Sequence, residues 1–180
     1  MTKEFAARRL DVKNFAEQGA VISGQAPVEQ HTRLMAETQG RGAQAPVRWS
    51  ASGEIRNARH VQPEIWLHLK ADATLSLTCQ RCLAPVDVPV RVERSFRFVP
   101  DEEIAAAQDE QAEEDVLALS RSFDLVELVE DELLMEIPLA PRHETCPPVK
   151  LALADAGFDN SPEPRENPFA FLGRLRTGKQ

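Results

Sequence analysis

The sequence predicts an α+β fold, in which an antiparallel β-sheet carries a few packed helices and an extended C-terminal tail follows. Apolar residues occupy alternate positions along two long neighbouring segments, the period of a strand with one buried face. A helical apolar period appears later, and prolines then recur to the end of the chain. The 180 residues suit a single α+β domain over residues 1–146, with an acidic segment at 101–115, and a Pro-rich tail over 147–180.

The first elements are short. Leu10 to Glu17 has the apolar spacing of a helix, and Gly19 ends it. Val21 and Ile22 form a brief extended run. A second helix is expected from Val28 to Glu37, before a glycine- and proline-containing loop.

The alternating segments predict three adjacent strands. They run over residues 47–56, 65–79 and 86–98, and in the second one the odd positions from Ile65 to Cys79 are all apolar or cysteine. Leu67, Leu69, Leu75 and Leu77 are therefore expected in the core. The loop from Gln80 to Pro85 is short enough for an antiparallel hairpin. Pro89 predicts an open edge or a bulge near the start of the third strand.

An acidic run and a capped helix complete the domain. Residues 101–115 hold eight acids and no base, which favours a solvated loop or a frayed helix. Asp124 is a suitable N-cap for a helix that Pro138 stops. This helix is expected to have an acidic outer face comprising Glu127, Glu130, Asp131 and Glu136.

Charge is divided unevenly along the chain. The net charge is −8, yet residues 1–100 carry 14 Lys or Arg against 10 Asp or Glu, whereas residues 101–146 carry 2 against 15. Such totals do not predict general steering toward nucleic acid, and the basic part could simply face the acidic part within the fold. The sequence has no long apolar run and no signal-like N-terminus, so we expect a cytoplasmic protein without a membrane span.

Three cysteines and one histidine form the clearest chemical motif. Cys79 and Cys82 are spaced to chelate one ion from a hairpin tip, and His143 and Cys146 repeat that spacing after the capped helix. A structural zinc site needs this set. The alternative is that Cys79 continues the buried face of its strand and that Cys82 and Cys146 are small packing residues. The helix is long enough to return the chain to one end of the sheet, although the sequence does not fix which end. We expect the hairpin end, because all three cysteines then come together and the four side chains converge.

Catalytic motifs are lacking, and we assign no catalytic or cofactor-binding residue. The sequence has no phosphate-binding loop, dinucleotide fingerprint or nucleophile elbow, and the Cys-x2-Cys pair lies between strands rather than at a helix N-terminus. Glu130, Asp131 and Glu132 invite a divalent-cation interpretation, but consecutive helical residues point in different directions. A solvated or partner-docking acidic face is the simpler interpretation of this run.

Several motifs together resemble a known family. They are Cys79-Gln80-Arg81-Cys82-Leu83, the stretch from Asp124 to Leu134, Pro138, Pro141, His143, Cys146, and Asn167-Pro168-Phe169-Ala170. In order and spacing they are similar to the YceD family of large ribosomal RNA subunit accumulation proteins, over roughly residues 10–176. The resemblance implies a cytoplasmic, non-enzymatic ribosome biogenesis factor that supports synthesis, processing or stability of 23S rRNA.

The resemblance leaves competing molecular roles. In the first, the protein meets 23S rRNA precursor or a pre-50S particle, with strand arginines such as Arg91, Arg94 and Arg97 on phosphate and the acidic segment on a basic ribosomal protein or a ribonuclease. In the second, it is a protein–protein adaptor with a structural zinc site and no direct RNA contact, using the acidic helix and the apolar patch at residues 167–172. A small metal-dependent enzyme is the third.

Overall fold

One antiparallel sheet organises the protein. The computed structural model describes residues 5–60 and 63–147, and the chain divides into two units, Met1–Pro147 and Pro148–Gln180. Five strands lie in the order in which they occur in the chain: β1 (Val21–Pro27), β2 (Pro46–Arg56), β3 (Glu64–Thr78), β4 (Pro85–Val99) and β5 (Asp115–Ala118). β1 to β4 are antiparallel neighbours, which confirms the predicted sheet, whereas β5 pairs parallel to β4 and was not predicted.

The alternation in β3 sorts its side chains between two faces. Leu67, Leu69, Leu75 and Leu77 are buried, as predicted, while Lys70 and Thr74 between them are exposed. β4 continues the same face, with Leu75 opposite Val88 in the register. Burying one face of each strand is the main stabilising contribution of the sheet, because each fully buried leucine removes its whole side chain from water.

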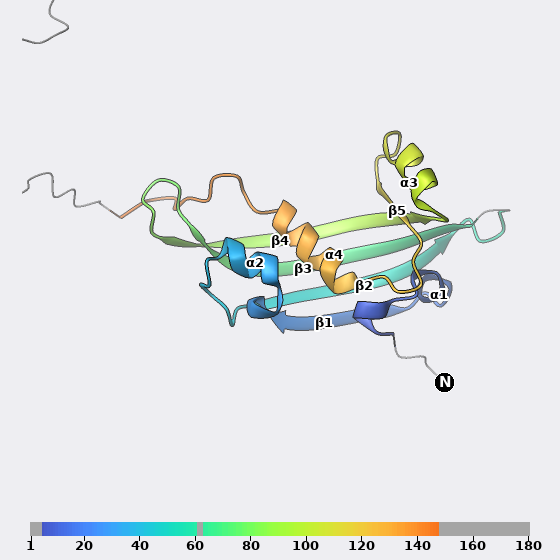
Figure 1. Cartoon of the computed structure of the whole chain (residues 1–180), viewed down its shortest axis with the longest axis horizontal. Coiled ribbons are helices and arrows are strands. Elements are labelled where there is room, and N and C mark those ends of the chain that lie inside the picture. Colours follow the sequence, from blue (N-terminus) through green and yellow to red (C-terminus); the bar gives the residue numbers. More distant parts are fainter. Residues whose placement is uncertain (1–4, 61–62, 148–180) are drawn as a thin grey trace, which may run out of the picture. The chain divides into compact units, whose positions relative to one another are not determined.

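Helices cover that apolar face (Figure 1). They are the 3-10 turns η1 (Ala7–Arg9) and η2 (Val28–Gln30) and the helices α1 (Val12–Glu17), α2 (Thr32–Glu37) and α4 (Leu125–Met135). Phe15, Leu34 and Leu125 from these helices join the strand leucines in one core cluster. We call the opposite, polar side of β2, β3 and β4 the open face.

Gly53 sets how closely α1 approaches the sheet. A Cβ atom at this position would lie 2.7 Å from the Cα of Ala16 and 2.8 Å from a ring carbon of Phe15. These distances are shorter than van der Waals contact, so the helix can sit on β2 because glycine has no side chain.

α4 begins as the sequence predicts. The carboxylate of Asp124 accepts hydrogen bonds from the backbone N–H groups of Val126 at 2.9 Å and Glu127 at 3.0 Å. The helix runs to Met135, and Leu125, Val129 and Leu133 on its inner side are fully buried. Capping and an apolar stripe therefore act together to place it on the sheet.

The acidic segment follows the helical one of its two predicted alternatives, a solvated loop or a frayed helix. It forms α3 (Glu102–Asp109), capped by the carboxylate of Asp101, and leads into β5, which was not predicted. A small apolar cluster of Val99, Ala105 and Val116 fixes this segment to the end of β4. In the described part of the chain, β5 covers β4 at Phe96–Val99, so Pro89 lies on an open edge as predicted.

The remaining predictions concern the ends and the membrane. The predicted Pro-rich tail and its apolar patch at residues 167–172 fall almost entirely outside the described residues. Within the part of the chain that the structure covers, the helices are too short or too polar for a bilayer span.

Candidate metal centre and charged surfaces

The four residues of the predicted metal site come together. One ligand atom each from Cys79, Cys82, His143 and Cys146 lies within 4.8 Å of all the others. The Sγ atoms of Cys79 and Cys146 are 3.7 Å apart, and the Sγ of Cys82 lies 3.4 Å from Nδ1 of His143. Residues 61 to 67 positions apart in the chain thus meet at one end of the sheet.

The β3–β4 turn presents the first two thiols. The N–H of Cys79 donates to the carbonyl of Ala84, and the N–H of Leu83 donates back to the carbonyl of Cys79, both at 2.9 Å. Leu83 adopts a left-handed φ of 61°, which tightens the turn after the second cysteine. A non-glycine residue in this region is strained, and such strain often marks a functional turn.

A backbone hydrogen bond joins the second pair to this turn. The N–H of Gln80 donates to the carbonyl of Pro141 at 2.8 Å, which holds the segment after α4 against the hairpin tip. Sequence reasoning did not identify Pro141 as a contact, because nothing local marks its carbonyl as an acceptor for a residue of the β3–β4 turn.

Surrounding groups orient the ligands. Nε2 of His143 lies 3.0 Å from the carbonyl oxygen of Pro85; because a carbonyl accepts, Nε2 carries the proton and Nδ1 keeps a lone pair toward Cys82. A carbonyl partner of this kind is typical of metal-binding histidines. The Nε of Arg81 donates to Sγ of Cys146 at 3.0 Å, which holds this sulfur beside the turn.

The backbone around Cys79 favours metal binding by its sulfur. Burial raises the pKa of its thiol, but nearby backbone N–H groups, that of Cys82 first, bring that pKa down to about 5. The thiolate is the form that binds a metal, so this sulfur is a competent ligand at neutral pH.

The spacing fits one tetrahedral ion. Zinc bonds of about 2.3 Å to sulfur and about 2.0–2.1 Å to nitrogen place two sulfurs about 3.8 Å apart, and sulfur and nitrogen about 3.5 Å apart. The two measured distances, 3.7 Å and 3.4 Å, agree with these values. Three thiolates and one imidazole also match the donor preference of zinc, and they fill all four positions.

The α4 carboxylates form only in part the solvated face that the sequence predicted: Glu127 and Glu136 are exposed, whereas Glu130 and Glu132 are buried. Glu130 is 8% exposed and its Oε1 accepts from the backbone N–H groups of Arg33 at 2.7 Å and Leu34 at 3.1 Å, so it caps the first turn of α2. Glu132 is 6% exposed and pairs with Arg94 at 3.1 Å; burial raises its pKa, and Arg94 opposes that shift. Both residues serve the fold, and their separate partners rule out a shared cation there.

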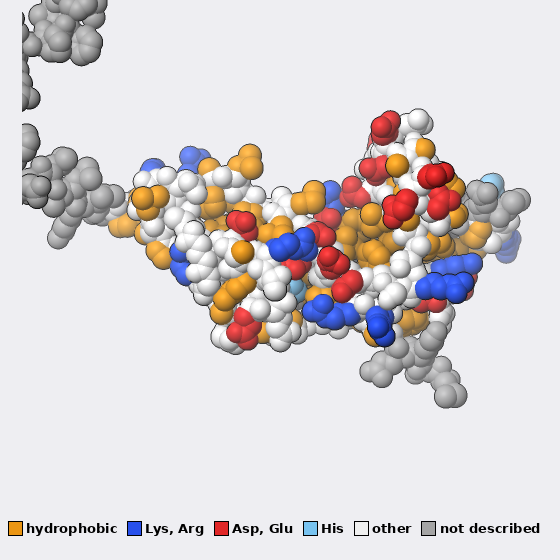
Figure 2. Space-filling view, in the orientation of Figure 1, with side chains coloured by type: hydrophobic (Ala, Val, Ile, Leu, Met, Phe, Trp, Pro, Cys, Tyr) orange, Lys and Arg blue, Asp and Glu red, His pale blue; other side chains and the backbone are white. Residues whose placement is uncertain are grey.

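The acidic lobe, residues 101–115, presents most of its carboxylates to solvent. Figure 2 shows them gathered on α3 at one corner of the molecule. Glu102, Glu103 and Glu110 are exposed, whereas Glu114 is held at 2.6 Å by Arg97, which lowers the pKa of Glu114. The described residues thus place a compact negative surface beside the end of β4.

The three strand arginines proposed for phosphate contact differ in availability. Arg97 is bound to Glu114 and Gln108, and Arg94 pairs with Glu132 and Asp115, so neither is free. Arg91 lies on the open face and has no ion pair among the described residues.

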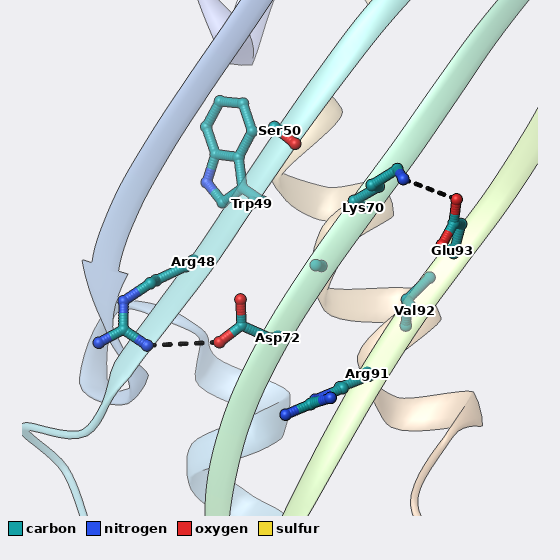
Figure 3. A pocket seen from close by; sticks show the side chains of 9 residues that line it. Arg48, Trp49, Ser50, Lys70, Asp72, Arg91, Val92 and Glu93 are labelled. Atoms are coloured by element: carbon teal, nitrogen blue, oxygen red, sulfur yellow. Dashed lines mark hydrogen bonds and ion pairs between the residues drawn. The ribbon is translucent and has the colours of Figure 1, made fainter.

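The open face around Arg91 is shallowly hollowed (Figure 3). Arg48 pairs with Asp72 at 3.3 Å, and Lys70 pairs with Glu93 at 2.7 Å. Cross-strand pairing leaves the hollow close to neutral, which is unlike the basic stripe of most nucleic-acid-binding surfaces.

His68 is held rather than free. Its ring lies between Ser95 and Glu54, with both ring nitrogens 2.8 Å from an oxygen. This order of side chains resembles a hydrolytic triad, but Ser95 sits within a regular strand paired with β3, not on the strained turn that exposes a nucleophile. We interpret the three residues as a clasp across β2, β3 and β4.

Comparisons with known proteins agree with the sequence motifs. Residues 67–176 match the family model described as "Large ribosomal RNA subunit accumulation protein YceD". A protein of that same name from Haemophilus influenzae is 27% identical over 143 residues, which cover 76% of this chain and 80% of the relative. No solved structure matches.

Proposed function

This chain belongs to the YceD family, and from that premise we propose that it is a cytoplasmic ribosome biogenesis factor that supports the accumulation of 23S rRNA. The match over residues 67–176 carries the proposal, because it includes most of β3, all of β4 and α4, and all four candidate metal ligands. The name of the Haemophilus influenzae relative, a large ribosomal RNA subunit accumulation protein, supports the same role.

The protein acts by binding rather than catalysis. Its hollow on the open face is shallow and lined by mutually paired charges, and His68 is held in a cross-strand clasp. Four protein ligands would leave zinc no open position for a substrate or water, which is the arrangement of structural sites.

The acidic lobe is the principal contact with the pre-50S particle. Its exposed carboxylates suit a basic ribosomal protein, or a ribonuclease with a basic surface, far better than RNA phosphate. Arg91 and the neighbouring open face add at most a limited contact with 23S precursor, since Arg94 and Arg97 are engaged within the protein. The particle is therefore recognised mainly through its protein component.

Structural zinc holds the cysteine end of the molecule together. Cys79 and Cys82 come from the β3–β4 turn, and His143 and Cys146 from the segment after α4, so one ion would cross-link two parts of the fold. Binding energy of the ion becomes folding free energy when the site forms only in the folded chain.

Metal analysis tests the zinc assignment. Protein purified without chelator should contain about one zinc per chain, and Cys82→Ser should lose it. Gln80→Ala is the matched control, because its exposed side chain lies within the same turn but offers no ligand. A zinc content below about 0.2 per chain with all thiols reactive would leave the four residues as a packing cluster.

Sedimentation tests the biogenesis role. In extracts of growing cells the tagged protein should migrate with pre-50S particles, and deletion of its gene should lower 23S relative to 16S rRNA. Glu102→Lys with Glu103→Lys should release it from the particle, whereas Asp87→Lys with Glu93→Lys on the open face makes the same change in net charge and should not.

The opposite results point elsewhere. If the deletion leaves 23S levels and the 50S profile normal, the biogenesis role is wrong, and capture of one protein after nuclease treatment would identify an adaptor. If binding to free RNA falls steeply with salt and the lobe variants have no effect, RNA phosphate is the main contact.

A further inference from the structure

β1 forms a free edge of the sheet. Figure 1 shows it at the border, with β2 on one side and no strand on the other. Among the described residues, β2 is the partner of its backbone. An uncovered edge strand presents a row of N–H and C=O groups that can pair with another strand.

The register shows which groups face outward. The N–H of Gly53 donates to the carbonyl of Ala20, and that of Val28 donates to the carbonyl of Ala45, at the two ends of the β1–β2 ladder. Since hydrogen-bonded pairs alternate in an antiparallel ladder, Ile22, Gly24 and Ala26 bond to β2. The backbone groups of Val21, Ser23 and Gln25 therefore point away from the sheet.

This edge has little of the usual protection. β1 contains no charged side chain, its only proline is the last residue, Pro27, and Val21 is 72% exposed. The uncovered part of β4 at the opposite border differs, because it carries Pro85, Pro89 and several charges. Proline and charge are the features by which edge strands avoid pairing, so their absence from residues 21–26 singles out this part of β1.

The outward groups are symmetric about Ser23. If a second copy approaches antiparallel with a two-fold axis at Ser23, Ser23 faces its own equivalent and Val21 faces Gln25. The three outward residues of each copy then form hydrogen-bonded pairs, which amounts to six backbone hydrogen bonds. No like charges meet, because the strand has none.

The residues of β1 between the outward ones, Ile22 and Gly24, are also complementary in this dimer. In the same register Ile22 of one copy lies opposite Gly24 of the other. Gly24 leaves its space to the ring of Trp49, since a Cβ there would be 2.4 Å from that ring. A half-exposed isoleucine would thus be placed next to a tryptophan ring rather than against a bulky side chain.

We propose that β1 is a homodimer interface, in which two copies of this chain pair β1 with β1 and join their sheets into one. A two-fold axis perpendicular to the sheet puts both helical layers on the same side and makes the two open faces continuous. Because the contact is a single strand pair, well below the size of an obligate interface, the dimer exchanges with monomer at micromolar concentrations.

Mass measured against concentration tests the proposal. The full chain, studied by sedimentation equilibrium from low to several hundred micromolar, should shift from monomer to dimer. Ser23→Lys should abolish the shift by placing two cations face to face, and Ser23→Pro should do so by removing the outward N–H while leaving the β2 ladder intact. Thr74→Lys adds the same charge to the open face of β3 and should dimerise normally.

Cross-linking tests the register. Facing residues of a hydrogen-bonded pair have Cα atoms about 5.5 Å apart, within the range of a disulfide. With oxidised glutathione as oxidant, Ser23→Cys should give disulfide-linked dimers, as should a mixture of Val21→Cys with Gln25→Cys. With Val21→Cys alone, the amount of disulfide-linked dimer should equal that of the wild type. This amount is the background that the native cysteines produce.

Several results would overturn the proposal. A chain that stays monomeric at every concentration has no such interface, even if an extended peptide from another protein binds the edge. A dimer that persists in Ser23→Lys uses another surface. Dimers without Ser23→Cys cross-links above background exclude the register centred on Ser23.

Discussion

Replacing Glu130 by alanine tests the most unexpected contact in the fold. This carboxylate, on α4, supplies the cap that α2 lacks, since the N-cap residue of α2, His31, makes no side-chain capping bond. A hydrogen bond to a charged group contributes about 1.5–3 kcal/mol, and Glu130→Ala removes two of them and leaves both backbone N–H groups without their acceptor. With Glu130 8% exposed, we expect the free energy of unfolding to fall by about 3–4 kcal/mol in Glu130→Ala.

Three further variants separate the possible causes. Glu130→Gln keeps an acceptor oxygen for the two N–H groups and should cost about 1 kcal/mol. Arg33→Met removes the ion pairs of a side chain that is 46% exposed but leaves the backbone bonds, so it should lower the stability much less than Glu130→Ala. Glu136→Ala, an exposed residue of the same helix end, should change stability by less than about 0.5 kcal/mol.

Urea unfolding followed by circular dichroism measures these differences. The midpoint should fall in the order of the predicted costs, with an unchanged slope against denaturant, since the area exposed on unfolding stays the same. The reasoning is refuted if Glu130→Ala lies within about 1 kcal/mol of the wild type, or if Arg33→Met is equally costly. The second result would mean that the ion pair, rather than the capping of α2, carries the stabilisation.

Further predictions follow from the core. Gly53→Ala should cost about 1–3 kcal/mol, because the added Cβ meets the backbone of Ala16 at 2.7 Å; a midpoint equal to the wild type would show that α1 can shift freely. Leu75→Ala should cost about 2–5 kcal/mol, and no change would mean that β3 is wrongly oriented. Burial lowers the pKa of His31, so the folded state favours the neutral ring. The free energy of unfolding should therefore rise with pH up to about 6.5, where the unfolded chain stops binding the proton. His31→Leu should lose this part of the pH dependence, which is measured as the difference in unfolding free energy from the wild type at each pH.

Local periodicity explains why the main strands could be predicted and β5 could not. β3 and β4 each alternate over many residues, and a buried face with period 2 has few alternatives. β5 has four residues, follows an acidic run and pairs parallel with β4, so its existence depends on the small cluster around Val116 rather than on its own pattern. The same acidic run was expected to be solvated because its few apolar residues gave no sign of that cluster.

The carboxylates of α4 show a second limit. Glutamates are rarely buried, so the outer face was the reasonable expectation for Glu130. Its burial is explained by two backbone N–H groups almost a hundred positions earlier in the chain, and by Arg33 beside them. A helix terminus without its own cap needs an acceptor, but the sequence of α2 does not say which element provides it.

The cysteine site could be predicted only in part from the local sequence. The Cys-x2-Cys spacing identifies one half locally, and the length of α4 shows that the second half can reach an end of the sheet. The hairpin end was predicted only because three cysteines would meet there, which is a chemical argument. The backbone hydrogen bond from Gln80 to Pro141 is the structural reason that the chain returns to this end. Two further contacts hold the ligands: the carbonyl of Pro85 accepts from His143, and the guanidinium of Arg81 donates to Cys146. None of these three contacts involves a metal, so the polypeptide itself holds the four donors near their tetrahedral spacing. Replacing a single ligand should therefore abolish metal binding before it disperses the other three residues, and the position of His143 in the Cys82→Ser variant, followed through its imidazole NMR signals, would distinguish this order from a site that metal alone assembles.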